Sequence, residues 1–264
     1  MAFAWGLIVG VIVCALVGAA IGYAAYQRME RLQRRTREAE RLAELGTLTG
    51  GLAHEIKNPL STVQLNLQLL EEDLDPKDPT QQRVINRLHT VQREAGRLRE
   101  TLDDFLRYAG KIELDKRATD VNELLEELVD FFSPQALLNR VQLRLRKFDG
   151  QLIVPLDARL IKQAVLNLMI NATQAMTTGG GELILSASKD DREACIDIID
   201  TGGGIPPDAL ANVFTAYYST KKGGTGLGLA ISQRIAREHG GSLTVKSEVG
   251  KGSDFTLHLP LGMN

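Results

Sequence analysis

Two runs of apolar residues at heptad spacing limit the fold of the first part of the chain. The first run is Leu42, Leu45, Thr49, Leu52, Ile56, Pro59, Val63, Leu67, Leu70 and Leu74, and the second is Val84, Leu88, Val91, Ala95, Leu98, Leu102 and Phe105. Alternating steps of three and four keep one face of a helix apolar. Because Pro76 and Pro79 interrupt any helix between the runs, the pattern predicts an antiparallel helical hairpin. One hairpin leaves both apolar faces poorly covered, so we expect a homodimer with a four-helix bundle.

The N-terminal residues have the composition of a membrane helix. No charged residue occurs from Phe3 to Tyr26, and roughly 20 such residues cross a bilayer. Five arginines follow within residues 28–37 and none precedes the run, which places the N-terminus outside and the remainder in the cytoplasm. A cleaved signal peptide would begin with basic residues. We therefore expect a retained single-pass anchor at residues 1–26 in the lipid bilayer of the inner membrane, followed by a juxtamembrane helix at 27–45.

From about residue 119 the pattern changes to interleaved strands and helices. Strand-like segments occur at 141–146, 152–155, 182–188, 194–200, 242–247 and 254–259, and helix-like segments at 121–132, 158–176 and 228–239. Asp157 is placed to cap the second helix. Without a strict βαβ rhythm, the order predicts an α+β fold in which helices cover one face of a mixed sheet.

Charge and cysteine content exclude several classes of function. The formal net charge of -2 gives no reason to expect direct nucleic-acid binding. Cys14 and Cys195 form no C-x-x-C pair, so no disulfide framework or thiolate metal site is predicted. The histidines at 89, 239 and 258 lack metal-like partners in the sequence and are expected to be structural.

The segment His54-Glu55-Ile56-Lys57-Asn58-Pro59-Leu60 carries the first candidate chemistry. With Leu52 and Ile56 pointing into the bundle, His54 faces outward and shares an exposed stripe with Glu55 and Asn58. A neutral imidazole can attack phosphorus, and Glu55 can hold the ring tautomer and accept a proton. An ordinary solvated His-Glu pair explains the same residues taken alone.

Polar residues on two predicted core elements form the next candidates. Asn167 and Asn171 are four residues apart on an apolar helix, and a carboxamide oxygen can hold Mg²⁺. A tertiary hydrogen bond is the simpler explanation of either asparagine. Asp200 ends a predicted buried strand before Thr201-Gly202-Gly203-Gly204, where it can accept a hydrogen bond from an exocyclic amine such as that of adenine. The glycines permit close backbone approach to a ligand, although a tight turn also uses them.

A glycine-rich loop precedes the last predicted helix. The segment is Gly223-Gly224-Thr225-Gly226-Leu227-Gly228-Leu229, with Lys221 and Lys222 just before it. Its amides and the helix N-terminus suit phosphate. No P-loop, H-R-D or D-F-G motif occurs, which excludes P-loop enzymes and Ser/Thr/Tyr kinases. The glycine spacing also differs from G-x-G-x-x-G, which disfavours a Rossmann site.

In their order, these motifs resemble those of the bacterial two-component sensor histidine kinases. His54–Leu60 is similar to the H box, Asn167–Ala172 to the N box, Asp200–Ile205 to the first G box, Phe214 to the F box and Gly224–Leu229 to the second G box. The resemblance implies a dimerisation and histidine phosphotransfer hairpin at 46–110, a linker at 111–118 and an ATP-binding domain at 119–264. That domain would be the α/β sandwich shared with gyrase, Hsp90 and MutL.

The resemblance also implies roles for individual residues. His54 would be the phosphoacceptor, Glu55 its general base, Asn171 the Mg²⁺ ligand with Asn167 nearby, and Asp200 the reader of adenine. The nucleotide site and its lid would contain Gly202, Gly204, Lys221, Lys222, Gly224, Gly226, Leu227 and Gly228. Glu55-x-x-Asn58 is similar to the family's phosphatase signature, and the short lid at 217–222 to that of nitrogen-regulation type kinases.

The expected activity is transfer of a phosphoryl group from Mg-ATP to His54 and then to an aspartate of a response regulator receiver domain. Dephosphorylation of that regulator is a further expected activity. Two alternatives remain open, namely an ATP-driven conformational machine of the gyrase or Hsp90 kind and a catalytically degenerate dimeric scaffold. The segment before the H box is too short for a PAS or full HAMP module, so the sequence indicates no sensor domain.

Overall fold

The computed structural model describes residues 56–72, 74–75, 78, 81–176, 179–221 and 224–262. One unit comprises residues 57–108 and 112–264, and the other comprises Met1–Ile56 and Ala109–Lys111. The predicted membrane anchor and juxtamembrane helix lie outside the described residues. Within the described ranges, no helix combines the length and apolarity needed to cross a bilayer.

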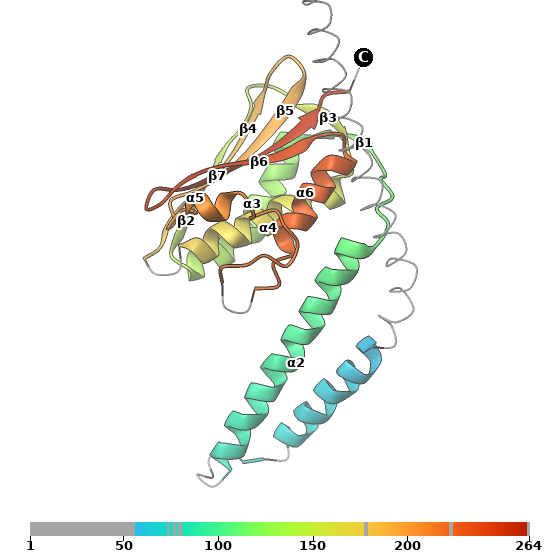
Figure 1. Ribbon diagram of the computed structural model, residues 1–264, viewed down its shortest axis with the longest axis vertical. Helices are drawn as coiled ribbons and strands as arrows, with labels where there is room; N and C mark the ends of the chain where they lie inside the picture. The colour runs from blue at the N-terminus through green and yellow to red at the C-terminus, as the bar shows by residue number, and fades with distance from the viewer. Residues whose placement is uncertain are drawn as a thin grey trace, which may run out of the picture. The chain divides into compact units, whose positions relative to one another are not determined.

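The predicted helical hairpin is confirmed. A first helix is described over residues 56–72, and α2 (Gln82–Ala109) follows after the proline-containing segment (Figure 1). Glu71 accepts hydrogen bonds from Gln92 Nε2 at 2.8 Å and pairs with His89 Nε2 at 2.6 Å. At the other end of the hairpin, Lys57 forms an ion pair with Asp103. Early residues of one helix thus meet late residues of the other, which makes the two helices antiparallel.

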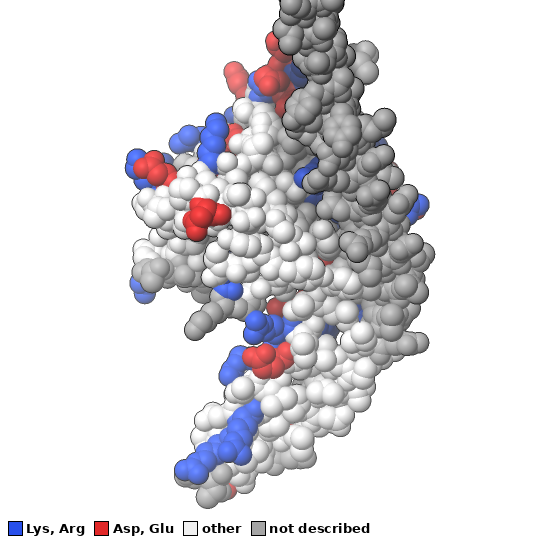
Figure 2. Space-filling model, viewed as in Figure 1, with Lys and Arg blue, Asp and Glu red and all other residues white. Residues whose placement is uncertain are grey.

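The apolar residues of the hairpin divide into an inner set, which includes Ile85 outside the predicted runs, and an outer set that belongs to those runs. Ile85 and Ala95 of α2 are 6% and 5% exposed. By contrast, other apolar side chains spaced seven residues apart remain on the surface, and we call them the outer stripe. With their exposed fractions, they are Val63 (46%) and Leu70 (53%) on the first helix and Val84 (46%), Val91 (48%) and Leu98 (61%) on α2. Six arginines lie on α2, and Figure 2 shows basic side chains in blue along this helix. A solvated helix does not need a heptad-spaced apolar stripe, so the outer stripe is a candidate dimer face.

The C-terminal part contains two sheets. The smaller pairs β1 (Arg117–Asp120) with β3 (Ile153–Leu156). The larger has the order β2-β4-β5-β7-β6, formed by β2 (Val141–Arg146), β4 (Gly181–Lys189), β5 (Glu193–Asp200), β6 (Ser242–Glu248) and β7 (Gly252–Pro260). Only the β2–β4 pairing is parallel within this sheet. The predicted mixed sheet is therefore confirmed.

Three helices cover one face of the larger sheet (Figure 1). These are α3 (Val121–Leu138), α4 (Ala158–Ala175) and α6 (Gly228–Glu238), while α5 (Pro207–Leu210) is a single short turn. Burial alternates along β5, where Ala194, Ile196 and Ile198 face the helices at 0% exposure. This alternation is what a sheet covered on one face requires.

Hydrogen bonds to side chains fix the start of α4. Asp157 accepts from the amide of Leu160 at 3.2 Å, as the predicted cap requires. His239 Nε2 in turn accepts from the amide of Asp157 at 3.0 Å, while Nδ1 donates to the carbonyl of Ile235 at 2.8 Å. Burial lowers the pKa of His239, which favours the neutral ring that these two bonds need. The structural role expected for His239 is confirmed.

The prediction of α3 was too short. The expected end was Phe132, but the helix continues through Pro134 to Leu138. A proline in a helix loses one backbone hydrogen bond, and here the buried side chains of Phe132 and Ala136 hold the turns on both sides against the core. The short elements β1 and α5 were not predicted.

Candidate functional site

Helix α4 carries the two asparagines of the predicted site. Its buried face includes Ile161, Val165 and Leu168, which belong to the hydrophobic core. Asn167 and Asn171 fall on a different, partly exposed face, and Asn167 Nδ2 donates to the carbonyl of Gly228 at 3.4 Å. This contact brings α4 to the beginning of α6.

Asp200 ends β5 and is 4% exposed. Its Oδ1 accepts a hydrogen bond from the amide of Gly202 at 2.8 Å, which fixes the orientation of the carboxylate. Burial raises the pKa of Asp200, and hydrogen bonds from Gly202 and Ser253 together with the charge of Lys221 oppose that rise. A buried carboxylate held in this way is ready to accept a hydrogen bond from a ligand.

The loop after Asp200 depends on glycine at two positions. Gly204 has φ +70, and a Cβ there would lie 2.1 Å from the carbonyl oxygen of Glu248. A Cβ at Gly202 would lie 2.8 Å from the Cβ of Ala175. The loop therefore runs against the end of α4 and the β6–β7 turn, which only glycines allow.

The predicted lid folds back on the glycine-rich loop. The amide of Tyr217 donates to the carbonyl of Gly226 at 3.1 Å, and a Cβ at Gly226, where φ is +68, would lie 2.6 Å from Tyr217. Helix α6 starts directly afterwards, and its N-cap Leu227 provides no side-chain hydrogen bond. The first amides of α6 are thus left without a side-chain cap, a condition that favours an anion.

Lys221 connects the lid to α4. Its Nζ donates to Gln174 Oε1 at 2.9 Å and lies 3.4 Å from the carbonyl oxygen of Asn171. Although Lys221 is exposed at the surface, partial desolvation by the atoms around its ammonium lowers the pKa of Lys221, and the charge of Asp200 opposes this effect. An ammonium group therefore lies among the predicted ligand-binding residues.

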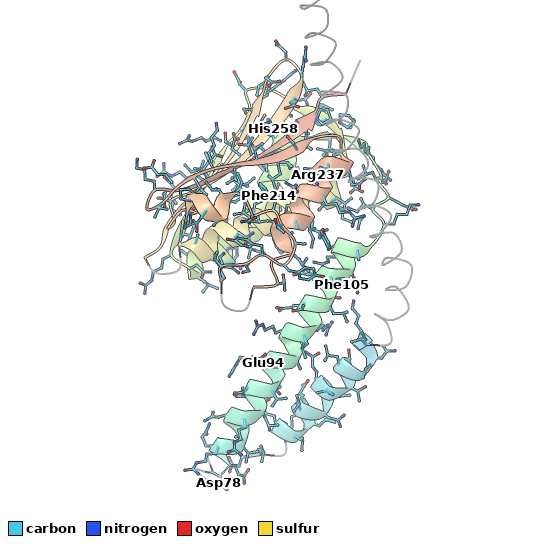
Figure 3. The ribbon with its side chains drawn as sticks, in the orientation of Figure 1. Asp78, Glu94, Phe105, Phe214, Arg237 and His258 are labelled. Atoms are coloured by element: carbon cyan, nitrogen blue, oxygen red, sulfur yellow. The ribbon has the colours of Figure 1, made fainter. Side chains whose placement is uncertain are left out.

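Phe214 anchors the segment that leads into the lid. Its ring lies edge-on to Phe255 of β7, with centroids 6.4 Å apart and an interplanar angle of 85°. Figure 3 labels Phe214 beside the helices of this part. Because Phe255 is 6% exposed, the contact ties the segment to the core.

The structure brings most of the predicted nucleotide residues together. These are Asn167, Asn171, Asp200, Gly202, Gly204, Lys221, Gly224, Gly226, Leu227 and Gly228, on α4, the end of β5, the lid and the start of α6. His54, Glu55 and Lys222 lie outside the described residues. Asn58 is exposed on the first hairpin helix.

Two polar residues at this site were not predicted. Gln174 holds Lys221, and only its position three residues after Asn171 could have suggested this role. Ser253 lies opposite Asp200 in the β5–β7 register and hydrogen-bonds to it, a contact that requires knowledge of the strand pairing.

The residues present fit a magnesium nucleotide. Among the residues that the structure describes, no cluster of three or more His, Cys, Asp or Glu could enclose a metal. Mg²⁺ bound to a nucleotide keeps waters and phosphate oxygens as ligands, so one carboxamide such as that of Asn171 is sufficient.

Comparisons with known proteins identify both parts of the chain. Residues 44–111 match the family model of the His Kinase A (phospho-acceptor) domain. Residues 156–263 match the model described as histidine kinase-, DNA gyrase B-, and HSP90-like ATPase.

Curated relatives align over nearly all of the chain. The sensor histidine kinase ZraS of Klebsiella oxytoca is 32% identical over 96% of this chain and 54% of its own length. ZraS of Escherichia coli (strain K12) is 34% identical over 91% of this chain and 51% of its own length. The chain thus spans about half the length of these relatives.

Solved histidine kinases share the fold. Full-length ShkA in complex with AMPPNP gives a TM-score of 0.69 at 28% identity, over 82% of this chain and 46% of ShkA. ThkA in complex with the response regulator protein TrrA gives 0.61 at 26% identity, over 84% of this chain and 64% of the solved chain. With a phosphoacceptor domain followed by a kinase-type ATPase domain, the chain belongs to the two-component sensor histidine kinases.

Proposed function

We propose that this protein transfers the γ-phosphoryl group of ATP to His54 and then to an aspartate of a response regulator. The observation that carries the proposal is the convergence of Asn167, Asn171 and Asp200 with the glycine-rich lid and the uncapped start of α6. The AMPPNP complex of the similar kinase ShkA supports an adenine nucleotide in such a site.

The nucleotide is held by groups of complementary character. Asp200 accepts the hydrogen bond of the adenine amine, and the lid amides and first amides of α6 face the phosphates. Asn171, with Asn167 beside it, binds the Mg²⁺ that accompanies ATP. When bound, this ion offsets charge on the phosphate oxygens.

His54 supplies the nucleophile. A ring nitrogen forms a bond to the γ-phosphorus while the bond from that phosphorus to the bridging oxygen of ADP breaks, and Glu55 accepts the ring proton. The protein contributes mainly positioning and charge. An aspartate of the receiver domain next takes the phosphoryl group from His54, and exposed Asn58 orients a water that later removes it from the regulator. The solved complex of ThkA with TrrA supports a regulator as partner.

The location we propose is the inner membrane, with residues 1–26 as a single-pass anchor and the kinase domains in the cytoplasm. The uncharged run followed by five arginines supports it.

The functional unit we propose is a homodimer joined through the outer stripe. Val91→Lys places an ammonium at the centre of this stripe, where burial in the bundle would cost several kcal/mol. We expect the variant to become monomeric at micromolar concentration in sedimentation of the full chain in detergent. Glu100→Lys, about half a turn away in angle on the same helix, introduces the same residue as a control and should leave the dimer intact. A Val91→Lys variant as dimeric as the unaltered protein would contradict this interface.

Phosphorylation of the full chain by γ-labelled Mg-ATP tests the proposed function. A phosphohistidine retains its label in alkali and loses it in acid, and we expect this behaviour. ATP hydrolysis without labelling of the protein would contradict the proposal and support an ATP-driven conformational machine. Failure of the protein to bind ATP would support a catalytically degenerate scaffold.

A further inference from the structure

Gln174 lies on the last turn of α4, one turn beyond Asn171. Its Oε1 accepts the 2.9 Å hydrogen bond from Lys221 Nζ, and the carbonyl oxygen of Asn171 is the second oxygen near that ammonium, at 3.4 Å. Lys221 comes from the lid, 47 residues later in the sequence than Gln174. This contact therefore fastens the lid to the helix that carries the proposed Mg²⁺ ligand.

The ammonium is also close enough to Asp200 for their charges to interact. The carboxylate expected to receive the adenine amine is thus already partly compensated by a cation of the same chain. An incoming base must compete with that cation for Asp200, and an incoming Mg²⁺ must approach Asn171 beside it.

We propose that Gln174 is a positioning residue that holds Lys221 across the nucleotide site, and that an adenine nucleotide displaces this lysine when it binds. Once displaced, the ammonium is free to pair with the nucleotide phosphates. The inference rests on the proposed function in one respect, namely that this site receives ATP.

We call the contact of Lys221 with Gln174 the latch. Loss of the lysine should then change the affinities for adenosine and for ATP in opposite directions. Adenosine has no phosphates, so a change in its affinity on substitution reports how easily Lys221 leaves Gln174 and Asp200. ATP loses the same obstacle but also loses a cationic partner for its phosphates. A residue that merely supported the fold would change both affinities in the same direction.

Calorimetric titration of the full chain in detergent tests the latch. We expect Gln174→Ala to tighten adenosine binding several-fold, because a partly exposed charged hydrogen bond no longer has to break. Gln174→Glu replaces it by an ion pair and should weaken adenosine binding. Lys221→Met should tighten adenosine binding and weaken ATP binding. In the Lys221→Met background, Gln174→Ala should have no further effect on adenosine.

Lys246→Met is the matched control, because Lys246 is an exposed lysine on β6 across from Asp254 of β7. It should leave both affinities unchanged. Equal effects of Gln174→Ala with and without Lys221 would overturn the latch, as would unchanged adenosine affinity in both single variants. This test measures binding and does not depend on phosphorylation. If the effect of Gln174→Ala depends on Lys221 but the protein is not labelled by γ-labelled ATP, the latch is supported and the proposed autokinase activity is refuted.

Discussion

His54→Gln is expected to abolish phosphorylation of the protein while leaving ATP affinity unchanged. Glutamine preserves polarity and approximate size but has no ring nitrogen to attack phosphorus. The residues proposed to bind ATP lie on α4, β5, the lid and α6, so removal of an imidazole from residue 54 takes nothing from the nucleotide. Acid-labile label and calorimetric ATP affinity, measured on the same preparation, separate the two effects.

His89→Gln serves as the control for this variant. His89 is also a hairpin histidine with a glutamate partner, Glu71, whose pKa is lowered chiefly by hydrogen bonds from Gln92 and His89. Its ring is thus engaged in holding the two helices together. We expect His89→Gln to retain phosphorylation. Full labelling of His54→Gln would refute His54 as the phosphoacceptor, whatever the control shows.

The larger elements of the fold could be predicted because each has a strong period. Heptad spacing specified the hairpin, and the break at Pro76 and Pro79 specified its turn. Along β5 the buried residues alternate as the sequence does. Asp157 was recognisable as a cap because only the adjacent helix amides were needed to explain it.

Contacts between distant segments could not be predicted in the same way. Gln174 and Lys221 are joined only when the lid folds onto α4, and Ser253 meets Asp200 only through the strand register. The partner in each contact is not indicated by the neighbouring residues in the sequence. The continuation of α3 beyond Pro134 also depends on tertiary packing, since Phe132 and Ala136 are buried in the core. Local propensity alone would end the helix there.

Asp200→Asn is expected to lower ATP affinity by about two orders of magnitude, which corresponds to roughly 3 kcal/mol for a lost hydrogen bond to a charged acceptor. The amide of Gly202 donates to Oδ1, so an asparagine keeps its oxygen there and turns its NH₂ toward the adenine amine. Two donors then face each other where the unaltered protein has a donor and an acceptor. Equilibrium binding of ATP measures the loss.

Asp254→Asn is the control, because burial also raises the pKa of Asp254, with the nearby charge of Asp197 adding to the effect. Asp254 belongs to β7, but its side chain alternates with the buried residues Ser253 and Phe255, so it points to the face of the sheet opposite the nucleotide site. We expect the ATP affinity of the Asp254→Asn variant to equal that of the unaltered protein. A loss as large as that of Asp200→Asn would mean that both variants act through the fold.

The pH dependence follows from the direction of the pKa shift of Asp200. A raised pKa in the folded protein means that folding disfavours the ionised carboxylate, so this group makes the folded state less stable at neutral pH. This destabilisation decreases as pH falls from the raised pKa of the folded state toward the ordinary pKa of the unfolded state, and it is absent below the latter. Asp200→Asn should therefore melt at a higher temperature than the unaltered protein at pH 7 without nucleotide. ATP affinity of the unaltered protein should fall as Asp200 becomes protonated, whereas the asparagine variant lacks that dependence. Higher thermal stability together with weaker ATP binding identifies a carboxylate kept buried for its ligand, and a variant that loses both would show instead that Asp200 serves the fold.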